Sequence, residues 1–244
     1  SDFANILANV ANKSMLKGYE ESPETFDVWT SVGNLSDFKT VSRVDLGLLP
    51  SLAKVDGGAE NTYATMSDRG VSVMLATYGK LFSISRQAVI NDDLNAFTKV
   101  PSKMGIAAKR TIGNLVYAIL TGNPTMADSV ALFHATHGNL LTGGSSALSA
   151  ASLDTGRSTM AKQKDPDNIK QGLNIIPAYW IGPVGLLGTA KQLFASQTEP
   201  GQSNPGVGNR VQGMATPVAD ARLDAASATA WYLAGGQQYD TIEV

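Results

Sequence analysis

The chain contains no cysteine among its 244 residues. Disulfides, thiolate metal sites and a cysteine nucleophile are therefore excluded, and the composition fits a reducing compartment. Histidine is almost absent as well, because the chain has only two. No apolar run approaches the roughly 18 residues that read as a membrane-spanning helix, and no signal peptide opens the chain.

Charged residues are also scarce. They make up 16% of the chain, against roughly 25% in ordinary soluble domains. A net charge of -2 gives no strong field that would favour nucleic acid or a membrane surface. Hydrophobic residues reach 43%, so the chain can bury a substantial core, and large subunit contacts would explain why so few solvating charges are present.

The first 21 residues predict an amphipathic helix. Ser1 or Asp2 can act as its N-cap. Its apolar residues follow the i, i+3, i+4, i+7 spacing of one helical face: Phe3, Ile6, Leu7 and Val10. Because the helix is terminal and turn-prone residues follow it, this face must dock either on the core of the same chain or on another molecule.

A long β-hairpin is predicted for residues 36–80. The stretches KTVSRVDL and GVSVMLATYGKLFSIS are rich in β-branched residues, and Val71, Val73 and Leu75 alternate with period two. The stretch between them contains Pro50, a glycine pair and several charges, which is typical of a polar tip. A two-stranded ribbon is marginally stable in water, so we expect it to pack on a sheet, a helix or a neighbouring subunit.

The strongest helical pattern runs from Leu94 to a Gly-Asn-Pro stop at residues 122–124. Its apolar stripe consists of Met104, Ala108, Ile112, Leu115, Val116 and Ile119. Asp92 and Asp93 are placed to cap it, and Pro101 should either kink it or begin a second helix. Its cations are Lys99, Lys103, Lys109 and Arg110, which we interpret as a solvated face rather than a nucleic-acid patch.

The remaining chain mixes helices and strands. A helix is expected from about Ser152 to Gln163, and NIIPAYWIGPVGLLGTAKQLFAS predicts a strand followed by a helix. Residues 197–214 are rich in Pro, Gly, Asn and Gln and predict a long surface loop. Residues 215–244 contain three short strand candidates. Because no regular βαβ alternation is present, the fold class is predicted as α+β.

The stretch ALFHATHGNLL holds both histidines, His134 and His137, in an HxxH spacing. Two imidazoles do not make a zinc site without a further ligand, and the nearest carboxylate is Asp128. The HExxH pattern of metalloproteases is absent. The Gly138-Asn139 end indicates a turn, so the alternative to a metal site is a pair of histidines whose hydrogen bonds hold a loop or an interface.

A glycine-rich turn follows the strand predicted near residue 180. Gly182, Gly185 and Gly188 are spaced GxxGxxG rather than GxGxxG, and Pro183 removes an N–H donor where a phosphate would need one. The first carboxylate downstream, Glu199, lies in a Pro/Gly loop. A dinucleotide site is therefore weakly supported. No Ser is accompanied by an evident base and acid, so hydrolase chemistry is unsupported too.

Several stretches taken together resemble a known family. They are FSISRQAVINDDLNAFTKVPSKMGIAAKRTIGN, ALFHATHGNL, LNIIPAYWIGP and DARLDAASATAWYLAG. From roughly residue 80 to the end, the chain resembles the major capsid proteins of tailed bacteriophages, in particular the Mu-like major head subunit group.

The resemblance implies the Hong Kong ninety-seven capsid fold. On that plan residues 1–35 are an N-terminal arm and residues 36–80 an extended loop. Residues 81–173 are a peripheral domain with a spine helix, and residues 174–244 are an axial domain with the start of a return to the peripheral domain. The exposed hairpin, the terminal helix and the low charge would then reflect subunit contacts, made by Phe3, Ile6, Leu7, Val10, Pro50, Val71, Val73 and Leu75.

The implied function is structural: copies form hexamers and pentamers of an icosahedral shell that encloses double-stranded DNA without sequence specificity. The implied partners are a scaffold or maturation protease, a portal and decoration proteins, in a virion assembled in the bacterial cytoplasm. No membrane, cofactor, metal or catalytic residue is implied. The open alternatives are an enzyme using His134 and His137 or the Gly182 turn, and a nanocompartment or gene-transfer particle with the same fold.

Two features of the chain's ends bear on this plan. Ser1 is expected to be a processed end, because family members are commonly made with a segment that is cleaved during maturation. Family chains usually return to the peripheral domain with a final strand, whereas this sequence stops at DTIEV. The final strand is therefore either short or cut off.

Overall fold

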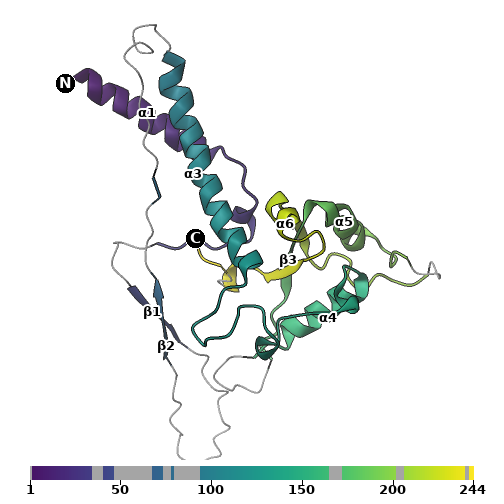
Figure 1. The fold of residues 1–244 in the computed structure, drawn as a ribbon. Coiled ribbons are helices and arrows are strands. Elements are labelled where there is room, and N and C mark those ends of the chain that lie inside the picture. Colours follow the sequence, from purple (N-terminus) through teal and green to yellow (C-terminus); the bar gives the residue numbers. More distant parts are fainter. Residues whose placement is uncertain are drawn as a thin grey trace, which may run out of the picture. The chain divides into compact units, whose positions relative to one another are not determined.

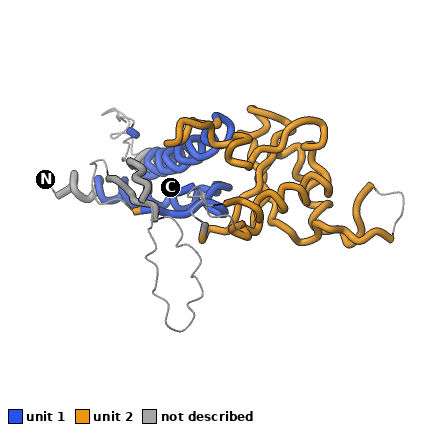
Figure 2. The backbone as a smooth tube through the Cα atoms, turned by 90° about the horizontal axis from the view of Figure 1, so that it is seen from below, with its two compact units in different colours: residues 1–33, 77–122, 240–244 blue, residues 34–76, 123–239 orange. Residues whose placement is uncertain are grey.

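A computed structural model shows an α+β fold, as predicted (Figure 1). It describes residues 2–34, 41–46, 68–73, 78–79, 94–164, 172–201, 206–239 and 242–244. The chain divides into two compact units (Figure 2). The helical unit comprises residues 1–33, 77–122 and 240–244, and the sheet unit comprises residues 34–76 and 123–239. Over the part of the chain that is described, no helix combines the length and apolar character needed to cross a membrane.

Two helices dominate the helical unit. Helix α1 spans Asp2–Glu20 and helix α3 spans Leu94–Gly122, so both predicted helices are confirmed. Pro101 lies inside α3 and does not begin a second helix. After the helix ends at Gly122, Asn123 takes a left-handed backbone conformation with φ of 45°. The predicted caps Asp92 and Asp93 lie outside the described residues.

Helices α1 and α3 lie side by side (Figure 1), and their backbones approach most closely at two glycines. A Cβ atom added to Gly18 would lie 2.2 Å from the carbonyl oxygen of Ser102. A Cβ added to Gly105 would lie 2.0 Å from the carbonyl oxygen of Met15. Glycine is therefore required at both positions, because the two backbones approach more closely than any side chain allows.

The segment after α1 is anchored to α3 by aromatic and polar contacts. A short 3-10 helix, η1, spans Phe26–Val28. Trp29 is 1% exposed, and its ring meets the Tyr117 ring edge-on with centroids 6.0 Å apart. Lys109 lies 2.7 Å from the Asp27 carboxylate, and its ammonium is 5.8 Å from the centroid of the Tyr19 ring. Aromatic packing and this charge pair, in which the Lys109 side chain is 12% exposed and that of Asp27 45% exposed, together fix the path of this segment.

A short parallel ladder joins distant parts of the helical unit. The Ser31 N–H donates to the Ile242 carbonyl, the Val244 N–H to the Ser31 carbonyl, and the Gly33 N–H to the Val244 carbonyl, each at 2.9 Å. Residues 242–244 therefore pair, through an isolated parallel bridge, with the segment that follows α1.

The two strands predicted between residues 36 and 80 are present. Strand β1, Val41–Leu46, and strand β2, Asp68–Val73, form an antiparallel pair in which Val41 faces Val73 and Leu46 faces Asp68. The predicted polar tip lies outside the described residues.

The core of the sheet unit is a three-stranded sheet of order β4-β3-β5. Strand β3, Pro177–Gly182, lies in the centre, parallel to β4, Thr216–Ala219, and antiparallel to β5, Tyr232–Gly235. The helices are α4, Ala150–Ala161; α5, Leu187–Ala195; and α6, Ala221–Ala226. The 3-10 turns are η2, Ala135–His137; η3, Gly144–Ser146; η4, Val184–Leu186; and η5, Gln237–Tyr239. The buried cluster contains Ala150, Leu153, Trp180, Ala190, Leu193, Phe194 and Val211.

Local capping explains where two helices of this unit begin. Helix α4 starts at Ala150, because Ser149 and Ser152 form a reciprocal capping box. The sequence placed this start at about Ser152. Helix α6 was missed, because residues 215–244 were predicted to hold only strands; Asp220 caps it by accepting the Arg222 N–H at 2.9 Å.

Candidate functional site

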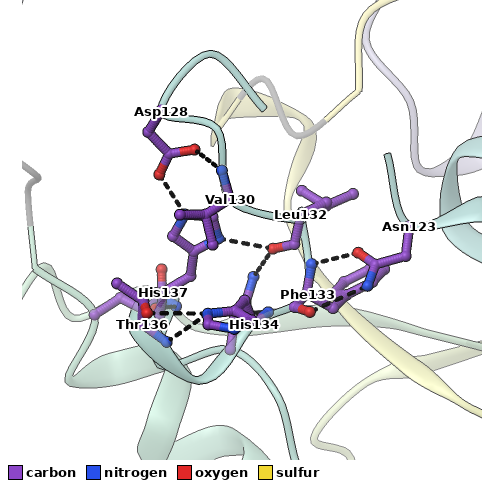
Figure 3. Close-up of polar contacts among 10 residues, drawn as sticks. Asn123, Asp128, Val130, Leu132, Phe133, His134, Thr136 and His137 are labelled. Atoms are coloured by element: carbon purple, nitrogen blue, oxygen red, sulfur yellow. Dashed lines mark hydrogen bonds and ion pairs between the residues drawn. The ribbon is translucent and has the colours of Figure 1, made fainter. Parts of the chain in front are cut away.

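Both histidines lie in a hydrogen-bonded turn of the sheet unit (Figure 3). His134 is the N-cap of η2, and its Nδ1 accepts the backbone N–H of Thr136 at 3.1 Å. The backbone N–H of His134 donates to Asn139 Oδ1 at 3.0 Å. Gly138 closes the turn with φ of 62°, a left-handed conformation that glycine adopts without strain. The turn that the Gly-Asn pair predicted is thus present.

The His137 ring ties the turn to the preceding loop (Figure 3). Its Nε2 lies 2.7 Å from Asp128 Oδ2, and its Nδ1 lies 3.0 Å from the Leu132 carbonyl oxygen. Asp128 Oδ1 accepts the Val130 N–H at 3.0 Å. The hydrogen bond that the His137 ring donates to the Asp128 carboxylate raises the pKa of His137 and lowers the pKa of Asp128.

The loop is held from a second direction by Asn123. The Phe133 N–H donates to Asn123 Oδ1 at 2.7 Å, and Asn123 Nδ2 donates to the Phe133 carbonyl at 3.2 Å. The Phe133 ring lies 5.3 Å from the Tyr232 ring on β5. No group of three or more His, Cys, Asp or Glu side chains that could hold a metal occurs over the described ranges. The histidine contacts are those expected of residues that hold a loop.

The glycine-rich turn after β3 is occupied by a carboxylate of the chain itself. Asp224 on α6 accepts the backbone N–H of Val184 at 2.6 Å and of Gly185 at 3.1 Å. These are the donors that a phosphate would need. Gly182 serves packing instead, because an added Cβ would lie 2.3 Å from the Trp180 indole. The turn thus has a structural explanation.

The loop predicted at residues 197–214 is internally braced. Arg210 donates through Nε and Nη2 to the Glu199 carboxylate, at 3.1 and 3.3 Å. Asn209 Nδ2 donates to the carbonyl oxygens of Leu193 and Ser196. Glu199 is 8% exposed, so this two-point pairing compensates for burying its charge. The carboxylate is therefore engaged in structure.

The helices of the helical unit expose apolar side chains. Val10 and Leu16 on α1 are 41% and 56% exposed, and Leu115 on α3 is 43% exposed. Within the predicted α3 stripe, Val116 is buried while Ala108 and Leu115 face solvent. Of the four cations on α3, Lys109 is paired with Asp27, and Lys99, Lys103 and Arg110 are exposed.

Comparison with known proteins identifies the family. The family described as phage capsid protein matches residues 70–244. The chain belongs to the phage capsid protein family. No curated protein matches it in sequence.

A solved capsid structure shares the fold. It is the capsid of bacteriophage JBD30 decorated with minor capsid protein trimers. The match has a TM-score of 0.61 at 15% sequence identity and covers 82% of this chain and 91% of that chain. The capsid fold that the sequence resemblance implied is therefore confirmed, and this capsid protein is a structural component of the virion.

For a capsid protein the functional site is its contact surface rather than a catalytic pocket. Among the predicted contact residues, Val10 is described and exposed. The structure does not describe the side chains of the other predicted contact residues, which are Phe3, Ile6, Leu7, Pro50, Val71, Val73 and Leu75. Sequence reasoning did not single out Met15 and Leu16, which expose apolar side chains next to the α1–α3 contact. A count of large apolar residues outside the predicted helical stripe could have found them.

Proposed function

We propose that this protein is the major capsid subunit of a tailed phage of the Mu-like group, and that its copies form hexamers and pentamers of an icosahedral shell around double-stranded DNA. The family match over residues 70–244 carries this proposal. Packaged DNA is held without sequence specificity, consistent with a net charge of -2 that provides no strongly basic surface.

The four-part division of the chain belongs to the same proposal. Residues 1–35 act as the arm, 36–80 as the extended loop, 81–173 as the peripheral domain with α3 as its spine, and 174–244 as the axial domain and return. Support comes from the two-stranded β1–β2 sheet, because a two-stranded ribbon needs a packing partner to be stable in water. A neighbouring subunit would supply that partner.

The contacts between copies are proposed to use the apolar face of α1 and the extended loop. The residues concerned are Phe3, Ile6, Leu7, Val10, Pro50, Val71, Val73 and Leu75. The exposure of Val10, the member of this α1 face whose side chain the structure describes, supports this use of α1.

Assembly is proposed to take place in the host bacterial cytoplasm, with a scaffold or maturation protease, a portal and decoration proteins as partners. The JBD30 capsid is itself decorated with minor capsid protein trimers, which supports the last of these.

Deletion of residues 50–69 tests the shell proposal. We expect the deleted chain to remain folded, with unchanged helical circular dichroism, and to form no shells, because the loop that reaches the neighbouring copy is gone. Sedimentation and negative-stain microscopy measure assembly, and the full-length chain is the control. Normal shells from the deleted chain would contradict the placement of the loop.

Metal analysis separates the capsid proposal from the enzyme alternative. Large particles or ring-shaped capsomers without zinc support the shell. A stable monomer with stoichiometric zinc would refute the proposal and favour a histidine-centred enzyme.

A further inference from the structure

The His137 ring is surrounded by hydrogen-bond acceptors. Nδ1 faces the Leu132 carbonyl oxygen at 3.0 Å, and Nε2 faces Asp128 Oδ2 at 2.7 Å. A neutral imidazole carries one N–H, so it can donate to only one of these oxygens, and its other nitrogen then faces an acceptor with a lone pair. The imidazolium cation carries two N–H groups and satisfies both contacts.

The acceptors are themselves fixed. The Leu132 carbonyl also accepts Asn139 Nδ2 at 2.7 Å, and Asp128 Oδ1 accepts the Val130 N–H at 3.0 Å. A carbonyl cannot become a donor, and the carboxylate is held in its accepting form by the Val130 N–H. Geometry alone therefore favours the charged ring.

Few other charges face this ring in the described residues. The neighbouring imidazole, His134, is engaged with Thr136. From the end of α4, Gln163 contributes a neutral amide, whose Nε2 donates to the His137 carbonyl at 3.1 Å. From β5, Tyr232 packs on Phe133, and burial raises the pKa of Tyr232 above its ordinary 10.0. The charge state of His137 is therefore coupled mainly to Asp128.

We propose that His137 is a proton-operated latch for residues 128–139: as a cation it closes the loop onto Asp128 and the Leu132 carbonyl, and on losing its proton it releases one of these contacts. The contacts of the latch all lie within one chain. It makes this surface loop of the capsid protein ordered under mildly acidic conditions and looser under alkaline ones.

The pH window follows from the two partners. The pKa of His137 is raised above 6.5, so its contribution is fully present below pH 6.5 and is lost as the pH rises through the folded value. The pKa of Asp128 is lowered below 3.8, so its contribution is fully present above pH 3.8 and is lost as the pH falls through the folded value. Between pH 3.8 and pH 6.5 the stabilising contributions of Asp128 and His137 are both fully present. Above pH 6.5 the opening constant should rise with pH until the folded pKa of His137 is passed.

Hydrogen exchange measured by mass spectrometry on the full chain tests the latch. Peptides covering residues 128–139 are compared at pH 5.5 and pH 8.5 after correction for intrinsic exchange, with α5 as the internal reference. We expect protection of the loop to fall several-fold at the higher pH while α5 is unchanged. His137→Gln and Asp128→Asn should each abolish this pH dependence, and His134→Gln is the matched control that keeps it.

Two results would overturn the proposal. One is equal protection of the wild-type loop at both pH values. The other is a pH dependence that survives in His137→Gln. Chemical-shift titration of His137 provides a second measurement, in which its pKa must lie above the ordinary 6.5 in the wild type and must fall in Asp128→Asn.

Discussion

Replacing Gly105 by alanine should separate helices α1 and α3. The added Cβ would lie 2.0 Å from the Met15 carbonyl oxygen and 2.7 Å from the Tyr19 nitrogen. Ordinary contacts begin at 3.4 Å, so the helices must move apart by more than 1 Å. Both obstacles are backbone atoms of α1, and no side-chain rotation can relieve them.

The expected free-energy change combines two opposing effects. Overpacking a close contact usually costs up to about 3 kcal/mol. We take this upper value because the added Cβ would clash with backbone atoms, which cannot rotate away. Alanine gains about 1 kcal/mol over glycine in a helix interior. The net loss of about 2 kcal/mol corresponds to a fall of about 4–8 °C in the unfolding midpoint of a chain of this size.

Thermal unfolding followed by circular dichroism measures this shift. Gly188→Ala in α5 is the matched control, because nothing lies within 4 Å of its added Cβ, and we expect an unchanged or slightly raised midpoint. Gly18→Ala should behave like Gly105→Ala, since its Cβ would lie 2.2 Å from the Ser102 carbonyl oxygen. A Gly105→Ala midpoint equal to that of the control would refute the close backbone contact.

Two further substitutions probe the sheet unit. Gly182→Ala should cost about 1–3 kcal/mol in unfolding free energy, because its Cβ would strike the buried Trp180 indole; an unchanged midpoint and unchanged tryptophan fluorescence would contradict this packing. Asp224→Asn should cost about 1 kcal/mol, because its NH2 group replaces one of the two oxygens that separately accept the N–H groups of Val184 and Gly185, and an NH2 group cannot accept; an equal midpoint in chemical denaturation would show that the carboxylate is dispensable.

Periodicity predicted the elements whose apolar residues recur regularly. Helix α3 was placed correctly because its apolar residues repeat with helical spacing and a Gly-Asn-Pro stop follows Gly122. Helix α6 escaped prediction because six residues, Ala221–Ala226, are too few to display a period. Its cap, Asp220, was the one local indication available.

Sequence patterns did not predict the contacts between residues that lie far apart along the chain. The apolar stripe through Leu115 predicted the helix α3 but not the close backbone contact that Gly105 makes with Met15. From sequence alone, a glycine within a helix indicates only low helix propensity. Its role in a close helix contact becomes visible once the neighbouring helix is placed. The Asp128–His137 pair likewise spans nine residues of irregular loop, where no repeat relates one side chain to the other. The turn itself was predictable, because Gly138 supplies its left-handed residue.

The ladder between Ser31 and Ile242–Val244 has a consequence for synthesis. Its partners are separated by 211 residues, so one side leaves the ribosome long before the other exists. Closing so large a loop is entropically costly and slow. The segment that follows α1 must therefore wait, without this backbone pairing, until translation has passed Val244. A nascent chain that has not yet reached Val244 therefore folds its first helix and the segment after it without this backbone closure.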